Sequence, residues 1–359
     1  MVLKKVNLGD FVTSYKISEQ SLESLKSQGV PNNVLDKLED IKNKDIKGRE
    51  NLLNILKELI GDEENIIHTN KLILNEAGFV KRIFNYCKRK NISVKNNLYY
   101  NLLKIKSKNG FFQKNIQGSK MILNLRDEGI SKELVFNDIR EAGATNYIYR
   151  AVKKDDVVID IGANIGYYAL MEARLVGDNG KIYAIEPAPQ NFEILKKNIS
   201  INGYKNIEVF NFAIGDKNGI EKLYISNKSN WHSMVAFDAQ GSEKTIDVTI
   251  LTIDTFLKDK KYPALIRMDV EGYEDKIIRG MIETLKKDRP LKLFIEIHPH
   301  IMKKDDVVFL FNILKQYKFE ITMIAKRSKC YNYNIDYILN NESILNGSKG
   351  AFQIFFERV

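Results

Sequence analysis

The stretch Val157–Tyr168, which reads VVIDIGANIGYY, decides the fold class. Its first five residues are apolar except for Asp160, which predicts a buried strand. Gly162 follows directly, Gly166 comes four residues later, and helical sequence then continues to Val176. Glycine permits a positive φ or a close approach of the backbone to a ligand. The pattern therefore predicts a strand, a glycine turn and a helix whose N-terminal amides face a bound ligand.

The same alternation of strand and helix continues through the second half of the chain. Strands are expected at 157–161, 181–185, 207–212, 265–269, 291–297 and 351–357, with helices ending near 176, 202, 285 and 317. The alternating residues Ile246, Val248 and Ile250 predict one further, half-buried strand. Strands that alternate with helices form βαβ units, so the predicted fold class is α/β with a doubly wound, mostly parallel sheet.

The N-terminal part of the chain has a different pattern. Apolar residues spaced by three and four at 34–41 and at 52–60 predict helices. The polar stretch 106–110 has the composition of a solvated turn. We therefore predict a mainly helical domain over residues 1–115 and a catalytic domain over residues 116–359.

Membrane spans and disulfides are not expected. The chain has no uncharged apolar run of about 18 residues, the length that a membrane-spanning helix needs. The N-terminus lacks the apolar stretch of a signal peptide. Cys87 and Cys330 are far apart and lack the spacing of metal ligands. Two lone cysteines are typical of a reducing compartment, and we expect the protein in the cytoplasm.

The net charge of +10 is concentrated in one segment. Residues 66–120 hold 12 Lys and Arg residues and one acid, Glu76, and aromatic residues are interleaved with the bases. Such a segment can be the solvated face of a helical core. It can also bind RNA through phosphates and unpaired bases, or an anionic surface such as a membrane or a lipid-linked sugar phosphate. These alternatives stay open at this stage.

An acid two residues before the first glycine indicates the cofactor. Dinucleotide sites use G-x-G-x-x-G, but Asn164 occupies the middle glycine position here. A carboxylate at Asp160 repels a pyrophosphate and attracts a cofactor that carries an ammonium and a sulfonium. Glu186 ends the second strand, where its carboxylate can accept hydrogen bonds from both ribose hydroxyls. The combination predicts S-adenosylmethionine as the cofactor and methyl transfer as the reaction.

Four stretches of the chain together resemble one family. They are 158–168 with Glu186-Pro187, then 211–216, 266–274 and 294–298, and they resemble the FkbM-type methyltransferases. The resemblance implies a class I methyltransferase (Rossmann-like) fold of seven strands, the last antiparallel. It implies methyl transfer to an oxygen of a sugar or a polyketide-like product. The chain departs from the family pattern at Arg267, where a lysine is usual.

The resemblance also implies roles for individual residues. Asp160, Gly162 and Asn164 are expected at the methionine moiety, Glu186 at the ribose, and 211–213 at the adenine. Asp269 and Glu271 are expected beside the methyl group. The complete predicted cofactor-binding set is Asp160, Gly162, Ala163, Asn164, Gly166, Glu186, Pro187, Asn211 and Ala213.

Titratable residues cluster after the fourth and fifth strands. Asp269, Glu271 and Glu274 lie within six residues of one another, and His298 ends the neighbouring strand beside Glu296. The carboxylates can act as bases, accept hydrogen bonds from sugar hydroxyls, or bind a cation, and the glutamates can simply stabilise the N-terminus of a helix. We predict Asp269, Glu271 and His298 as catalytic residues, and no metal site, because the ligand spacing is not decisive.

The leading hypothesis is an S-adenosylmethionine-dependent O-methyltransferase. Its acceptor is a sugar, a glycan or a related hydroxylated small molecule. The alternative is an RNA-directed methyltransferase in which residues 66–120 bind RNA and present a ribose or a base to the same catalytic domain.

Overall fold

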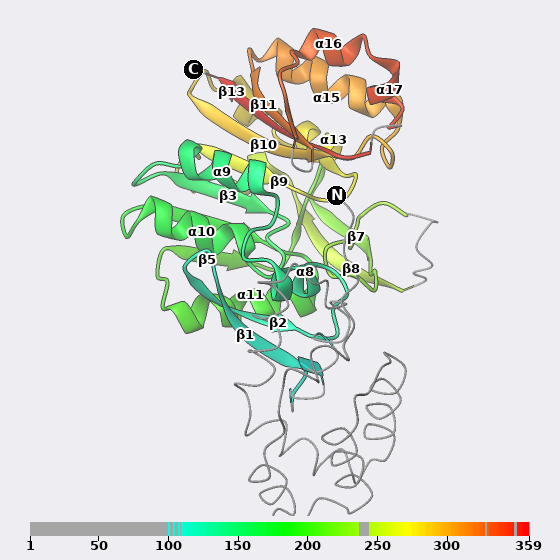
Figure 1. Ribbon diagram of the computed structural model, residues 1–359. Coiled ribbons are helices and arrows are strands. Elements are labelled where there is room, and N and C mark those ends of the chain that lie inside the picture. The colour runs from blue at the N-terminus through cyan, green and yellow to red at the C-terminus, as the bar shows by residue number, and fades with distance from the viewer. Residues whose placement is uncertain are drawn as a thin grey trace, which may run out of the picture. The chain divides into compact units, whose positions relative to one another are not determined.

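The computed structural model describes residues 100, 103–104, 107, 109–236, 244–326, 329–347 and 350–358. The chain divides into two compact units, Met1–Asn109 and Gly110–Val359, and nearly all described residues belong to the second (Figure 1). The second unit begins a few residues before the predicted boundary at 116. The helices predicted at 34–41 and 52–60, and most of the basic segment 66–120, lie outside the described residues. Within the described part of the chain, no helix is long and apolar enough to cross a membrane.

An eight-stranded sheet forms the centre of the second unit, in the order β12-β11-β13-β10-β9-β3-β4-β5. Its strands are β3 (Val157–Ile161), β4 (Lys181–Ile185), β5 (Ile207–Phe210), β9 (Leu265–Met268), β10 (Leu291–Ile297), β11 (Glu320–Lys326), β12 (Lys329–Tyr331) and β13 (Phe352–Arg358).

The pairing of these strands confirms the predicted class I fold. The five strands from β10 to β5 pair in parallel, and β13 runs antiparallel to both β10 and β11. The last strand is therefore antiparallel, as expected. The sheet has one strand more than the seven predicted, because the short β12 adds to the edge beside β11.

Helices cover both faces of the sheet (Figure 1). They are α8 (Ile130–Phe136), α9 (Ala142–Ala151), α10 (Tyr167–Val176), α11 (Pro189–Asn202), α12 (Ile253–Phe256), α13 (Glu274–Arg279), α14 (Ile282–Lys286), α15 (Lys304–Gln316), α16 (Ile335–Leu339) and α17 (Glu342–Leu345). Helix α10 packs on β3 and β4, and α13 packs on β10 and α15.

The alternation of side chains along β3 decides what each face contains. Ile159 and Ile161 belong to the main core, together with residues of α13 and α15 such as Ile277 and Leu310. Because successive side chains of a strand point to opposite faces, Asp160 points to the other face of the sheet. Its side chain is fully buried there.

Two smaller β structures flank the sheet. Strands β6 (Ala213–Ile214), β8 (Thr245–Leu251) and β7 (Gly219–Tyr224) form a three-stranded sheet in that order, and β8 is the strand predicted around Val248. An unpredicted hairpin, β1 (Phe111–Ile116) and β2 (Ser119–Asn124), packs on α11. Asn198 of α11 ties this hairpin to the glycine turn, since its amide accepts from Ile122 N at 2.6 Å and donates to Ile165 O at 2.8 Å.

Candidate active site

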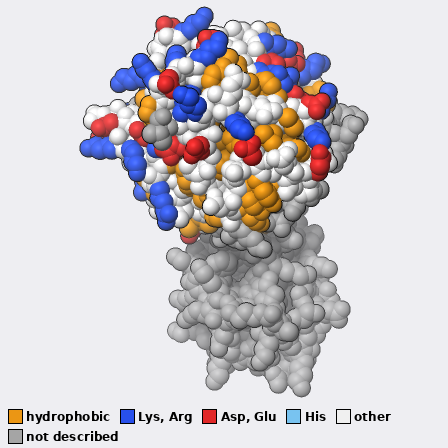
Figure 2. Space-filling model, turned by 90° about the horizontal axis from the view of Figure 1, so that it is seen from above, with side chains coloured by type: hydrophobic (Ala, Val, Ile, Leu, Met, Phe, Trp, Pro, Cys, Tyr) orange, Lys and Arg blue, Asp and Glu red, His pale blue; other side chains and the backbone are white. Residues whose placement is uncertain are grey.

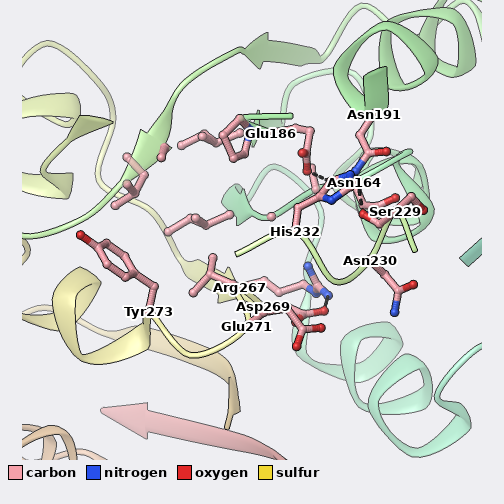
Figure 3. Close-up of a pocket in the computed structure, with 18 of the residues that line it drawn as sticks. Asn164, Glu186, Asn191, Ser229, Asn230, His232, Arg267, Asp269, Glu271 and Tyr273 are labelled. Atoms are coloured by element: carbon pink, nitrogen blue, oxygen red, sulfur yellow. Dashed lines mark hydrogen bonds and ion pairs between the residues drawn. The ribbon is translucent and has the colours of Figure 1, made fainter. Parts of the chain in front are cut away.

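A cavity opens at the carboxyl ends of β3, β4 and β9, the edge at which doubly wound sheets bind ligands (Figure 3). Eight of the predicted site residues line it: Gly162, Ala163, Asn164, Glu186, Pro187, Ala213, Asp269 and Glu271. Residues from β3, β4, β9 and the loops after them therefore meet at one place, as the sequence pattern predicts.

The glycine turn is fixed by backbone geometry. Gly162 has a φ of +76°, and a Cβ at this position would lie 2.1 Å from the carbonyl oxygen of Asp269. Only glycine lets the ends of β3 and β9 approach this closely. Asn164 also has a positive φ, +52°, and its side-chain Oδ1 accepts from Ile165 N at 2.8 Å. Asparagine adopts this conformation more readily than most residues because its side chain bonds the local backbone.

Glu186 joins the turn to the end of β4. Its Oε2 accepts from Asn164 N at 2.8 Å, and its Oε1 accepts from Ala188 N at 2.9 Å. Burial raises the pKa of Glu186 to about 7, although the backbone donors of Ala188 and Asn164 act in the opposite direction. Each carboxylate oxygen keeps a further lone pair, so this side chain can accept hydrogen bonds from a diol in the cavity.

Asp160, which is expected at the methionine moiety, does not line the cavity. The side chain points to the α10 face of the sheet, where its Oδ1 lies 2.8 Å from Nη1 of Arg267. Arg267 lines the cavity, and its Nη2 lies 3.1 Å from Oδ2 of Asp269. Arg267 therefore connects Asp160, which strand alternation turns to the other face of the sheet, with Asp269 of the cavity.

Gly166 and Asn211, which were also predicted to bind the cofactor, do not line the cavity either. A Cβ at Gly166 would lie 2.8 Å from Cδ1 of Leu195, so this glycine permits close packing between α10 and α11. Asn211 donates from Nδ2 to the carbonyl oxygens of Glu186 and Pro187, at 2.9 and 3.0 Å. It supports the loop after β4 from outside.

His298 lies next to the cavity, behind Glu271. Its Nδ1 is 2.8 Å from Oε1 of Glu274, and its Nε2 is 3.3 Å from Oε2 of Glu271 and 3.9 Å from Oε1 of Glu296. Burial lowers the pKa of His298, but the three carboxylates outweigh it and hold this pKa well above its usual range. Glu271 has an unusual positive φ of +53°, and its carbonyl oxygen accepts from Ser233 at 2.7 Å.

Burial also raises the pKa of two acids in this cluster. The pKa of Glu271 lies at about 7 and that of Glu296 at about 8, and in both cases the charge of Asp269 acts in the same direction as burial. Although the spacing of these residues in the sequence predicts no metal site, ligand atoms of Asp269, Glu271 and His298 lie within 4.8 Å of one another.

The loop after β7 closes one side of the cavity, which Ser229, Asn230, His232 and Met234 of this loop line. Ser229 O accepts from the side-chain amides of Asn164 and Asn191, at 2.8 and 2.9 Å (Figure 3). Ser229 N and Oγ both donate to Asp127, at 2.9 and 2.7 Å. These contacts join segments that lie far apart in the chain, so no local pattern predicts them.

His232 of the same loop lines the cavity. Burial lowers its pKa to about 4, against the opposing charge of Asp127. Its Nδ1 accepts from Ser226 N at 3.0 Å, so the neutral ring carries its proton on Nε2. The residue is therefore an uncharged hydrogen-bond donor at neutral pH.

The sheet order, the glycine turn and the acid at the end of β4 define a class I S-adenosylmethionine-dependent methyltransferase. Residues 160–321 match the family described as "Methyltransferase FkbM domain". This match covers a little under half of the chain and agrees with the four stretches that resemble the FkbM-type methyltransferases. A second family, "Protein-L-isoaspartate(D-aspartate) O-methyltransferase (PCMT)", matches residues 83–222.

Curated relatives agree with methyl transfer. The chain is 26% identical over 176 residues to hexuronic acid methyltransferase AglP of Haloferax volcanii, a match that covers 47% of this chain and 67% of that protein. It is 42% identical over 59 residues to a protein-L-isoaspartate O-methyltransferase of Methanococcus maripaludis, which covers 16% of this chain and 26% of that protein. Several of the curated relatives are thus matched over only about a quarter of their length.

Among solved structures, the chain is similar to TYW2 of M. jannaschii, crystallised with AdoMet. The TM-score is 0.38 at 14% identity, and the match covers 70% of this chain and 86% of that one.

Proposed function

We propose that the chain transfers a methyl group from S-adenosylmethionine to an oxygen atom of a sugar, a glycan or a related hydroxylated metabolite. The observation that supports this proposal most directly is the concentration of carboxylates at one end of the cavity. Asp269 and Glu271 line that end, and Glu296 lies next to it. The name of the relative AglP indicates a sugar acid as the acceptor of that protein, and it supports the same class of acceptor here.

The donor side of the cavity has the groups that the cofactor needs. Glu186 offers carboxylate lone pairs to the ribose hydroxyls, and the backbone at 162–163 leaves room for close approach because Gly162 has no side chain. The guanidinium of Arg267 and the carboxylate of Asp269 are the charged groups next to this turn. When bound, S-adenosylmethionine supplies a methyl group on a positively charged sulfur.

The acceptor side has to align an oxygen with that methyl group and receive its proton. Carboxylates accept hydrogen bonds from the several hydroxyls of a sugar, and they orient one of them toward the donor. In the transfer, the acceptor oxygen forms a bond to the methyl carbon while the carbon–sulfur bond breaks. The hydroxyl proton passes to a neighbouring carboxylate or to water.

A labelled-methyl assay tests the acceptor class. The full chain is incubated with radiolabelled S-adenosylmethionine and, separately, with neutral oligosaccharides, hexuronic acids, an isoaspartyl peptide and RNA. We expect label in a carbohydrate fraction, and we expect it to disappear in Glu186→Gln but not in Glu193→Gln, an exposed acid of α11. Label in the peptide alone or in RNA alone would contradict the proposed acceptor.

RNA is included among the tested acceptors because the segment 66–120 is basic and could bind phosphates. On the face of the second unit seen in Figure 2, Lys and Arg side chains are interspersed with Asp and Glu. A nucleic acid binds best to a surface on which basic side chains predominate, so this mixture favours a carbohydrate over RNA as the acceptor.

A further inference from the structure

We propose that Asp269, Glu271 and His298 bind one divalent metal ion at the acceptor end of the cavity. Their ligand atoms lie within 4.8 Å of one another. Atoms that are each about 2.0–2.4 Å from a shared ion lie no more than about 4.8 Å apart, so the three side chains can reach one ion with little movement. Binding of the ion itself does not depend on the proposed acceptor.

The hydrogen bonding of His298 is that of a metal ligand. Histidines that bind metals almost always donate the proton of their other ring nitrogen to a carboxylate or a carbonyl, which fixes the ring. Here Nδ1 of His298 is 2.8 Å from Oε1 of Glu274. Glu274 is completely buried and also accepts from Gly272 N at 3.1 Å, so it is itself held in place. Nε2 is thereby turned toward Glu271.

A buried polar atom beside His298 gives a second indication. Oε2 of Glu274 is buried and has no hydrogen-bond partner among the described residues. A carboxylate that is buried with one oxygen unpaired is costly, unless its charge is used by a neighbouring cation. The adjacent ring of His298 supplies this positive charge, whether Nε2 holds a proton or is bound to a metal ion.

The charges around Nε2 also require a cation. When neutral His298 donates from Nδ1, Nε2 presents a lone pair. This lone pair faces carboxylate oxygens of Glu271 at 3.3 Å and Glu296 at 3.9 Å. Negative groups at this separation repel each other strongly in a buried site. A proton on Nε2 satisfies these carboxylates in the ion-free protein, and a divalent ion that displaces the proton satisfies the same charges and also reaches Asp269.

The donor set indicates the class of ion. Two carboxylates and one imidazole suit a divalent ion such as Mn²⁺, Fe²⁺, Co²⁺ or Zn²⁺ and leave coordination positions open. Asp269 and Glu271 line the cavity, so these positions face the acceptor. If the acceptor is a sugar, as proposed above, two neighbouring oxygens can occupy them, and the ion then makes a hydroxyl easier to deprotonate.

Titration with Mn²⁺ tests the site. The full chain is stripped with a chelator, and free Mn²⁺ is followed by electron paramagnetic resonance. We expect one ion per chain, bound at least tenfold more weakly by Glu271→Gln and by His298→Gln. The matched control, Glu283→Gln, removes an exposed carboxylate that is paired with Lys286, and it should bind as the unmutated chain does. Absence of saturable binding up to about 1 mM Mn²⁺, or equal binding by all four proteins, would overturn the proposal.

Two further measurements keep the test decisive. The near-ultraviolet circular dichroism of each variant shows whether it is folded. Anomalous diffraction from crystals of the unmutated chain soaked in Mn²⁺ needs no substitution at all. A peak between Asp269, Glu271 and His298 is expected, and a peak only elsewhere would contradict the site. Mn²⁺ binding without methylation of any carbohydrate would refute the proposed acceptor and leave the metal site standing.

Discussion

Nη1 of Arg267 lies 2.8 Å from Oδ1 of Asp160, and the two side chains are 3% and 0% exposed. The same guanidinium lies 3.1 Å from Asp269 and 4.1 Å from the centre of the Tyr168 ring. Burial lowers the pKa of Arg267, but the two carboxylates outweigh this and raise it. The acid of the glycine-turn motif thus holds a permanently charged side chain against the cavity.

We expect Arg267→Met to destabilise the chain strongly, because it leaves Asp160 buried without its partner. Breaking a buried pair in this way costs about 3–5 kcal/mol. The double variant Asp160→Asn with Arg267→Met should regain part of that loss, since residue 160 is then uncharged and only Asp269 lacks its ion-pair partner. Urea denaturation of the three proteins measures both effects.

Lys196→Met is the control, since Lys196 is 48% exposed and its partner Glu193 is 57% exposed. Its unfolding free energy should change by no more than about 1 kcal/mol. Equal losses for Arg267→Met and Lys196→Met would show that the buried pair does not have the role assigned to it.

The pKa of Glu186, raised to about 7, predicts how cofactor binding depends on pH. Ribose hydroxyls donate to the ionised carboxylate, which is the minor form below pH 7. The affinity for S-adenosylhomocysteine should therefore fall by up to tenfold per pH unit from pH 7 to pH 5, with uptake of a proton from buffer on release of the ligand. Calorimetry in buffers of different ionisation enthalpy measures both quantities.

The same carboxyl also makes the stability of the ligand-free chain depend on pH. This stability falls as the pH rises, whereas the affinity for the ligand increases. Its folded pKa is raised, so its contribution to stability is complete below about pH 4.5 and is lost as the pH rises through about 7. Glu186→Gln should remove this loss and should also flatten the pH dependence of binding, whereas Glu193→Gln should leave both unchanged. A pH dependence that persists in Glu186→Gln belongs to another group.

The contact between Ser229 and Asp127 predicts a role for the loop after β7 in retaining the cofactor. Asp127→Ala removes the acceptor of two hydrogen bonds that hold Ser229 over the cavity. The affinity for S-adenosylhomocysteine should fall roughly tenfold, about 1.4 kcal/mol, mainly through faster dissociation. Stopped-flow displacement measures the rate, and Asp138→Ala, at an acid whose side chain is 70% exposed, is the control. Identical dissociation rates in the two variants would exclude this role.

Alanine substitutions at two glycines with similar φ distinguish the cost of steric crowding from the cost of backbone strain. Gly162 and Gly203 have φ values of +76° and +71°, but only Gly162 has a neighbouring atom in the way, the carbonyl oxygen of Asp269. Gly203→Ala should cost about 1 kcal/mol of unfolding free energy. Gly162→Ala should cost about 3 kcal/mol or more and abolish binding of S-adenosylhomocysteine, because β3 and β9 must move apart. Chemical denaturation compares them, and equal costs would contradict this explanation.

Local sequence pattern predicted the parts of the fold that depend on periodicity. The strands at 157–161, 181–185 and 291–297 lie where the apolar runs placed them. The hairpin of β1 and β2 was missed because it is held by contacts from another part of the chain, such as those of Asn198. The short β12 gave no signal, since three residues are too few for a period.

The candidate site was predictable to the extent that its residues follow strand ends. Glu186 and Asp269 line the cavity for that reason. Asp160 does not line the cavity, because strand alternation turns its side chain to the other face of the sheet. The pairing of His298 with Glu274 connects residues 24 positions apart, which no spacing rule anticipates.

Crystallography of the full chain with S-adenosylhomocysteine shows where the cofactor binds. We expect the ligand at the carboxyl ends of β3, β4 and β9, with its ribose hydroxyls within hydrogen-bonding distance of Glu186. We also expect the homocysteine part near Gly162 and the sulfur facing Asp269. A ligand bound elsewhere, or a ribose that does not contact Glu186, would contradict this expectation.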